Sequence, residues 1–192
     1  MTFRHTIITS VAVLALAACG RGNDTASTNT MATTPTVDGT SVAGTAPAAA
    51  TSGAQGFANV AAASDAFEIE TSRLALTNGA SAGVKAYANK MIEAHTASTA
   101  KLKTAASSVT PAITPDPALN AEQQQKLDQL KALNGTAFDQ AYKTEQAAGH
   151  QQTLDALRAY AATGDAPQLK AFASEMVPIV TAHLNMAKAI KA

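Results

Sequence analysis

The sequence predicts an all-α domain: a four-helix bundle with an extra short helix in the crossover between the second and third long helices. Apolar residues recur at three- and four-residue spacing along four long segments, which is typical of amphipathic helices. After residue 18, no segment shows the period-two alternation of a half-buried strand. Four long helices joined by two short connections and one longer crossover are typical of a four-helix bundle.

Residues 1–18 have the layout of a lipoprotein signal peptide. Arg4 and His5 precede an apolar run over residues 7–18. The run is too short to span a membrane, because a spanning helix needs about 20 apolar residues. The tetrapeptide LAAC at residues 16–19 resembles the bacterial lipobox, in which Cys19 becomes the acylated N-terminus. An ordinary secretory peptide that ends near a cysteine is the alternative.

Residues 19–55 are predicted to form a lipid-anchored, disordered tether. Small and polar residues make up almost all of this segment, which has no aromatic residue. Such a composition cannot bury enough apolar surface to offset the entropy lost on ordering. Gly20 stands where an aspartate would resemble an inner-membrane retention signal, so we expect the outer membrane, with the domain of residues 56–192 in the periplasm.

Capping residues predict where the first two long helices begin and end. The first helix is expected from Phe57 to Thr77, and the pair Asn78–Gly79 suits the left-handed conformation that closes many helices. Ser81 can cap the second helix, whose apolar stripe fades near Ser108.

A proline-rich loop follows, and similar signals divide the rest of the chain. Asn120 is expected to begin the short helix, and Asn134–Gly135 to stop it. Thr136 and Asp139 have the spacing of a capping box at the start of the third long helix. Pro167 is suited to the first turn of the last helix.

Three histidines lie on expected core faces of three different helices. His95 and His183 fall in line with the apolar stripes of the second and last long helices, and His150 lies on an inner face of the third. Glu70 would add a carboxylate from the first helix, with Glu68 as a competing candidate. Because buried imidazoles and carboxylates are costly unless paired or coordinated, a hydrogen-bonded network or a metal site is expected. This donor set suits a single transition-metal ion: zinc, copper, nickel or iron.

The composition argues against several other functions. The chain carries 14 Lys plus Arg and 14 Asp plus Glu with no basic run, so nucleic-acid binding has no support. Once Cys19 is lipidated, no thiol remains for a disulfide or a nucleophile. The sequence also lacks the zinc-protease, nucleophile-elbow and phosphate-loop signatures, which leaves a catalytic role without positive support.

Short motifs occur in order around the three histidines: EIE at 68–70, VKAYA at 84–88 before His95-Thr96, FDQAY at 138–142 before His150-Gln151, and LKAFA at 169–173 before His183-Leu184. They resemble a family of bacterial predicted outer-membrane proteins that carries a ferritin-like four-helix domain of unknown function. The resemblance spans about Phe57 to Ile190 and implies the ferritin-like fold, but no established reaction. The family often has an acidic residue immediately before the second- and third-helix histidines, where this chain has Ala94 and Gly149.

Two functions remain open at this point. The first is a non-enzymatic cell-envelope lipoprotein, held to the membrane through Cys19, whose bundle binds a ligand, a metal ion or an envelope partner protein. The second is a mononuclear metal-binding protein that uses the three histidines and Glu70 for redox chemistry or metal handling. A di-iron carboxylate site is not expected, because Ile92 and Val180 stand where its Glu-x-x-His motifs would need glutamates.

Overall fold

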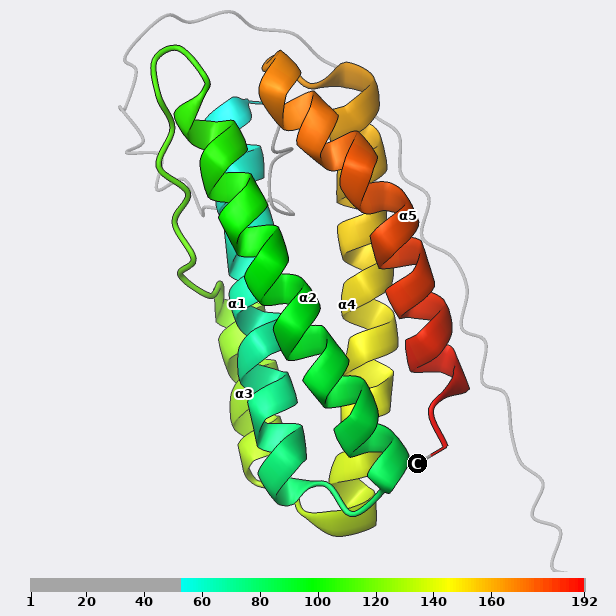
Figure 1. Cartoon of the computed structure of the whole chain (residues 1–192). Helices are drawn as coiled ribbons and strands as arrows, with labels where there is room; N and C mark the ends of the chain where they lie inside the picture. Colours follow the sequence, from blue (N-terminus) through cyan, green and yellow to red (C-terminus); the bar gives the residue numbers. More distant parts are fainter. Residues whose placement is uncertain (1–52, 192) are drawn as a thin grey trace, which may run out of the picture. The chain divides into compact units, whose positions relative to one another are not determined.

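The computed structural model describes residues 53–191, which fold as five α-helices without a β-strand in that range (Figure 1). The helices are α1 (Ala54–Asn78), α2 (Ala82–Ser107), α3 (Ala121–Lys131), α4 (Gly135–Thr163) and α5 (Pro167–Ala189). This confirms the predicted all-α bundle with a short helix in the crossover. The signal peptide and Cys19 lie outside the described residues. The predicted tether does so up to residue 52, but residues 54 and 55 already belong to α1.

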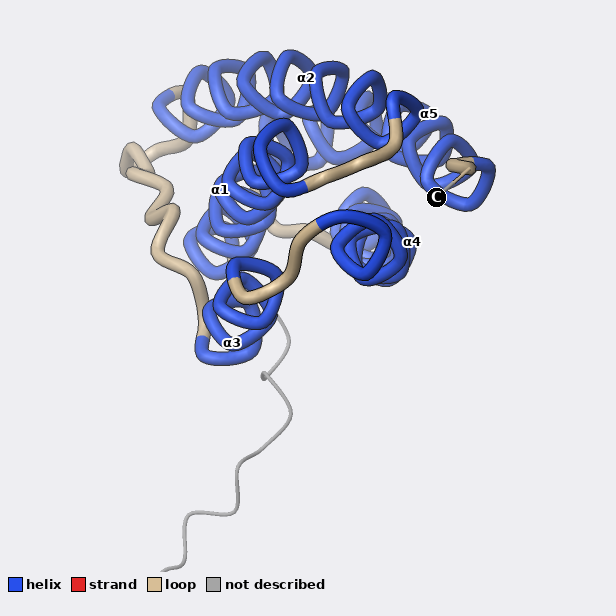
Figure 2. Tube along the Cα trace, turned by 90° about the horizontal axis from the view of Figure 1, so that it is seen from below, coloured by secondary structure: helices blue, strands red, loops and turns tan. Residues whose placement is uncertain are grey.

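The four long helices form two antiparallel pairs, α1 with α2 and α4 with α5, and the pairs face each other across the core. Figure 2 shows the short helix α3 beside α1, with the crossover from α2 running along the outside of α1 to reach it. None of the described helices combines the length and apolarity that crossing a membrane requires.

Buried apolar side chains form two clusters, one toward each end of the bundle. One contains Phe57, Leu102 and Leu154, and the other contains Met91 and Tyr142. Each long helix contributes residues to both clusters. All four helices therefore pass from one cluster to the other at about the same height in the bundle. The polar side chains that the long helices carry between these levels are therefore brought together in the middle of the bundle.

Side-chain caps fix two helix starts as the sequence predicts. The Ser81 hydroxyl accepts hydrogen bonds from the backbone N–H groups of Gly83 and Val84, at 3.1 and 3.4 Å. At α3, Asn120 Oδ1 accepts from Gln123 N at 2.9 Å, and Gln123 Oε1 accepts from Asn120 N at 3.0 Å. The reciprocal hydrogen bonds of Asn120 and Gln123 form a complete capping box, which satisfies two backbone donors at once.

The turn between α1 and α2 corrects two predictions. Gly79 is extended, with φ −72° and ψ 145°, rather than left-handed. A Cβ at this position would lie 2.6 Å from Ala75 O and 3.0 Å from Asp139 Oδ1, so the glycine is needed for close packing. The Thr136–Asp139 capping box was also wrong, because α4 begins at Gly135 and the Asp139 carboxylate points to the α1–α2 turn.

Replacing Asp139 with alanine is expected to lower the free energy of unfolding by about 1–3 kcal/mol. The buried carboxylate accepts hydrogen bonds from Ala80 N at 3.1 Å and Ser81 N at 2.8 Å, and both donors would lose their partner. Urea unfolding measures the change. The control is Asp128→Ala on the exposed face of α3, for which a change within about 0.5 kcal/mol is expected. Equal effects of the two variants would contradict the bridging role of Asp139.

Candidate metal centre

The three histidines predicted from the sequence meet in the middle of the bundle. His95 of α2, His150 of α4 and His183 of α5 each place one ring nitrogen within 4.8 Å of the other two. The ring centroids of all three pairs are 5.5 Å apart, so the rings surround a common point. The residues are only 1–7 % exposed. Three helices thus direct imidazole nitrogens into one enclosed space.

The positions of the apolar residues explain why the histidines meet at one height. His95 lies between Met91 and Leu102 on α2, and these two residues belong to opposite apolar clusters. His150 has the same relation to Tyr142 and Leu154 on α4. Packing of the two clusters therefore sets the register that brings the imidazoles together.

Asp65 of α1 contacts the outer nitrogen of His95, which is Nδ1, the ring nitrogen that does not face His150. Asp65 Oδ1 lies 2.8 Å from His95 Nδ1, and Asp65 Oδ2 accepts a hydrogen bond from the Thr99 hydroxyl at 3.1 Å. A carboxylate accepts only, so His95 Nδ1 is the donor. In neutral His95, the lone pair is then on Nε2, which faces the other histidines.

The outer nitrogen of His150 is fixed in a similar way by the backbone. His150 Nδ1 lies 2.8 Å from the carbonyl oxygen of Gln146, which can only accept. Neutral His150 therefore also has its lone pair on Nε2. The Nε2 atoms of His95 and His150 are 3.4 Å apart, so two lone pairs would face each other across this gap. A proton or a metal ion between them removes the repulsion.

His183 offers a neutral third nitrogen. Burial, followed by the charges of His95 and His150, lowers the pKa of His183 to about 4, and its Nδ1 is buried without a hydrogen-bond partner. Burial also lowers the pKa of His95, but the Asp65 hydrogen bond and the charges of Glu68 and Asp65 outweigh it and raise that pKa. A proton bound in the cluster is thus favoured on His95, away from His183.

The prediction that Glu70 joins the histidines is wrong. Glu70 is exposed on the outer face of α1, whereas Glu68 is 2 % exposed and its Oε1 lies 3.6 Å from His150 Nδ1. The inward face of α1 runs through the small and polar residues Ala61, Asp65, Glu68 and Ser72. Glu68 contacts the outer nitrogen of His150 and is not one of the three residues whose ligand atoms converge.

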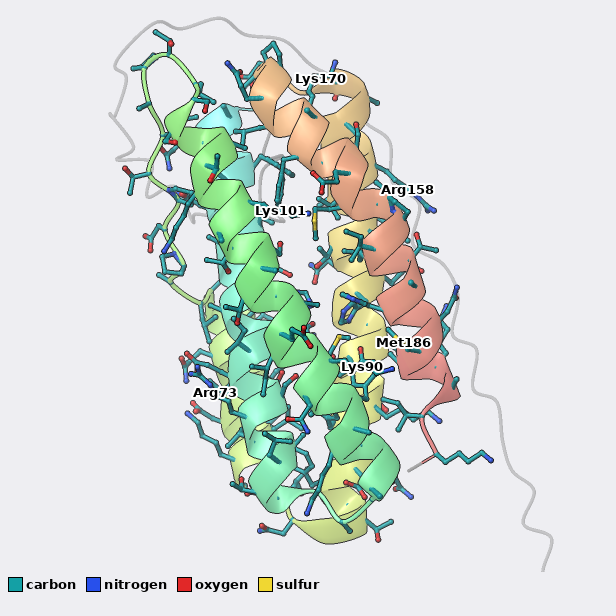
Figure 3. The ribbon with its side chains drawn as sticks, viewed as in Figure 1. Arg73, Lys90, Lys101, Arg158, Lys170 and Met186 are labelled. Carbon is teal, nitrogen blue, oxygen red and sulfur yellow. The ribbon has the colours of Figure 1, made fainter. Side chains whose placement is uncertain are left out.

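Lysine and arginine side chains are carried on the outside of the bundle. Arg73, Lys90 and Arg158, labelled in Figure 3, are exposed on the outer faces of α1, α2 and α4. The ion pairs that Asp65 and Glu68 form are instead with His95 and His150. The charge balance of the core therefore depends on the histidines.

The donor set fits a metal ion. Two nitrogens bound to one ion at 2.0–2.1 Å with tetrahedral geometry are roughly 3.3–3.4 Å apart. The Nε2 atoms of His95 and His150 already have this separation, at 3.4 Å. The His183 nitrogen lies within 4.8 Å of the other two, so a shift of about 1.4 Å or less would bring it to the same 3.4 Å separation. Asp65 and the Gln146 carbonyl hold the outer nitrogens as partners of metal-bound histidines do.

Buried hydroxyl groups continue the polar interior along α1 and α4. The Tyr142 hydroxyl lies 2.7 Å from the Ser72 hydroxyl, and both residues are fully buried. Gln146 Nε2 donates to the Thr71 hydroxyl at 3.3 Å. Burial raises the pKa of Tyr142, so the phenol stays protonated.

We expect Tyr142→Phe to lower the free energy of unfolding by about 1 kcal/mol, because the Ser72 hydroxyl loses its buried partner. The double variant Tyr142→Phe, Ser72→Ala removes both groups. Thermal and urea unfolding of Tyr142→Phe, Ser72→Ala and the double variant together give the coupling energy of the two hydroxyl groups. A coupling near zero would contradict the hydrogen bond.

Comparison with known proteins gives a family and a fold. The family model described as Domain of unknown function (DUF4142) matches residues 39–190, so the match begins inside the predicted tether. No curated protein matches the sequence. A solved structure titled "CopM in the Cu(II)-bound form" is similar, with a TM-score of 0.59 and 15 % sequence identity over 70 % of this chain and 93 % of that chain. At this identity the likeness shows a shared helical fold alone.

The predicted resemblance to a family with a helical domain of unknown function is confirmed, while its outer-membrane location stays a prediction. The match covers most of the chain and includes α1 to α5. The chain belongs to the DUF4142 family.

Proposed function

We propose that the bundle is a non-enzymatic module that binds one transition-metal ion through His95, His150 and His183. The observation that carries this proposal is the pair of Nε2 atoms facing each other at 3.4 Å. The outer nitrogens of both rings are engaged as donors, so the inner ones present lone pairs to the same point. The neutral imidazole of His183, whose buried Nδ1 has no hydrogen-bond partner, supplies a third donor.

Copper is the first metal to test. Imidazole nitrogens suit copper, zinc, nickel and iron, and divalent copper binds such sites most tightly in the first transition series. The structure with the similar fold is titled as Cu(II)-bound, which supports the same choice. Three protein ligands leave a position for water or a transferable ligand. We therefore propose that the ion is held for storage or transfer.

We further propose that the module acts in the cell envelope, attached through a lipid on Cys19. The layout of residues 1–19 and the lipobox-like tetrapeptide support this proposal. Mass spectrometry of the mature N-terminal peptide from the native host is expected to find an acylated cysteine. Release of the protein from membranes in a Cys19→Ser variant would agree, and an unmodified Cys19 in the mature protein would contradict it.

Metal analysis of untagged protein tests the proposed function. Protein from the native host, and apoprotein titrated with Cu(II) or Zn(II), are compared with the His95→Ala, His150→Ala, His183→Ala triple variant. We expect about one ion per wild-type chain and none at this site in the folded triple variant. Glu70→Gln is the matched control and should bind as wild type, because Glu70 is exposed. A folded wild type that binds no metal would leave a protonated hydrogen-bond network as the role of the histidines.

A further inference from the structure

A cleft of about 430 Å³ opens on the surface and reaches Glu68, the carboxylate in contact with His150. Its walls come from α1, α4, the end of the crossover and the first turns of α3. Figure 2 shows these elements on one side of the bundle, with α3 beside α1. Glu68, the buried carboxylate beside His150, is among its lining residues.

Glu68 links the cleft to the histidine cluster. Its Oε1 lies 3.6 Å from His150 Nδ1, and its Oε2 is buried without a hydrogen-bond partner. A carboxylate oxygen in this position is costly unless a cation or a donor approaches it. Since Glu68 lines the cleft, a cation arriving through the cleft can satisfy this oxygen.

Gly149 leaves the space that the Glu68 carboxylate occupies. A Cβ at Gly149 would lie 3.1 Å from Glu68 Oε1, closer than ordinary van der Waals contact. Gly149 lines the cleft and directly precedes His150 in α4. The absence of a side chain here therefore keeps the cleft open beside the carboxylate.

The outer part of the cleft is acidic. Asp116, Glu122 and Glu145 line it together with one cation, Lys126. Lys126 Nζ lies 2.8 Å from Glu122 Oε1 and 3.3 Å from Glu145 Oε2, so it neutralises only part of this charge. A low-dielectric cleft lined mostly by one sign of charge raises the local concentration of the opposite ion.

We propose that this cleft is the access route by which a divalent metal ion reaches the histidines, with Glu68 as the carboxylate that receives the ion before His150 and its neighbours bind it. The inference rests on the proposed function, because it needs a metal site at the end of the route. The histidines are buried, so an ion must enter through some opening. The cleft supplies the opening and the attractive charge, and it is lined by Glu68, which carries a partnerless oxygen.

Loading kinetics test the route. Full-length apoprotein is mixed with Cu(II) supplied from a weak chelator, the approach to saturation is followed by stopped flow, and the copper bound at equilibrium is measured separately. Glu68→Gln and Gly149→Ala should each slow loading by about tenfold or more. Lys126→Gln should accelerate loading several-fold at low ionic strength, with the gain lost in high salt. Glu70→Gln, outside the cleft on the same helix, should load as wild type.

The outcomes separate the route from the metal site. If the wild type binds one copper but all variants load at the wild-type rate, the route is wrong and the proposed function stands. If the folded wild type binds neither Cu(II) nor Zn(II) at equilibrium, both proposals are wrong. The acceleration expected of Lys126→Gln distinguishes an effect on the route from damage to the fold. A damaged fold would not make loading faster at low ionic strength and unchanged in high salt.

Discussion

Replacing His150 with alanine is expected to weaken Cu(II) binding roughly 100-fold or more, since even replacing a residue that only hydrogen-bonds a metal ligand costs 10- to 100-fold. His150 faces both other histidines, with its Nε2 3.4 Å from that of His95 and its ring centroid 5.5 Å from that of His183. The variant loses one ligand and the contact that positions the others. Competition titration against a copper chelator of known affinity measures the change.

Metal-dependent stability provides a second readout of the same variant. A ligand at 100 times its dissociation constant stabilises the folded state by about 2.7 kcal/mol, which corresponds to a rise in Tm of about 10 °C for a domain of this size. We expect this rise in the wild type and in the exposed control Gln151→Ala, but not in His150→Ala. Equal copper-induced shifts in all three proteins would place the copper outside the histidine cluster.

Replacing Asp65 with alanine is expected to lower the free energy of unfolding of the apoprotein by about 3–5 kcal/mol, the usual cost of removing one partner of a buried ion pair. Asp65 is 5 % exposed and His95 is 2 % exposed, so water cannot readily replace the lost carboxylate. The Thr99 hydroxyl would lose its acceptor as well. Urea unfolding in the presence of a metal chelator measures the effect.

Two further variants, Asp65→Asn and Asp155→Ala, show whether the loss of stability comes from the buried pair. Asp65→Asn keeps an oxygen that can accept from His95, so its loss should be clearly smaller than that of Asp65→Ala. Asp155→Ala removes an exposed carboxylate on α4 and should change the stability by no more than about 0.5 kcal/mol. A loss for Asp65→Ala no greater than that for Asp155→Ala would contradict the buried pair.

Helix ends could be predicted from the sequence where a single side chain satisfies local backbone donors. Ser81 and Asn120 are such residues, and both cap their helices as expected. Asp139 was misassigned because its partners, Ala80 and Ser81, lie 59 and 58 positions away in the chain. A local capping rule cannot include partners that only tertiary packing brings near.

The three histidines could be predicted because each lies on an apolar stripe, which identifies the inward face of a helix. Periodicity within one helix does not fix its height relative to the others. In this bundle, packing of the two apolar clusters sets that height. The convergence of the nitrogens is therefore a property of the folded domain.

The carboxylates could not be predicted in the same way. Phe67 and Leu74 suggested a face of α1 that includes Glu70, but Leu74 is only half-buried in the structure. The inward stripe of Ala61, Asp65, Glu68 and Ser72 has low hydrophobicity, because its polar members face the histidine-containing interior. The sequence signal for the inward face of α1 was the three- and four-residue spacing of small and acidic residues. The apolar residues of the same helix pointed to a different face, which includes Glu70.

The anomalous scattering of copper-loaded crystals, recorded at the copper absorption edge, is the most direct test of the metal centre. We expect one strong anomalous peak about 2.0–2.2 Å from a ring nitrogen of each of His95, His150 and His183. Asp65 and the Gln146 carbonyl should keep their contacts with the outer nitrogens of His95 and His150. A histidine cluster without a peak, or copper bound only at surface side chains, would contradict a metal site in the core.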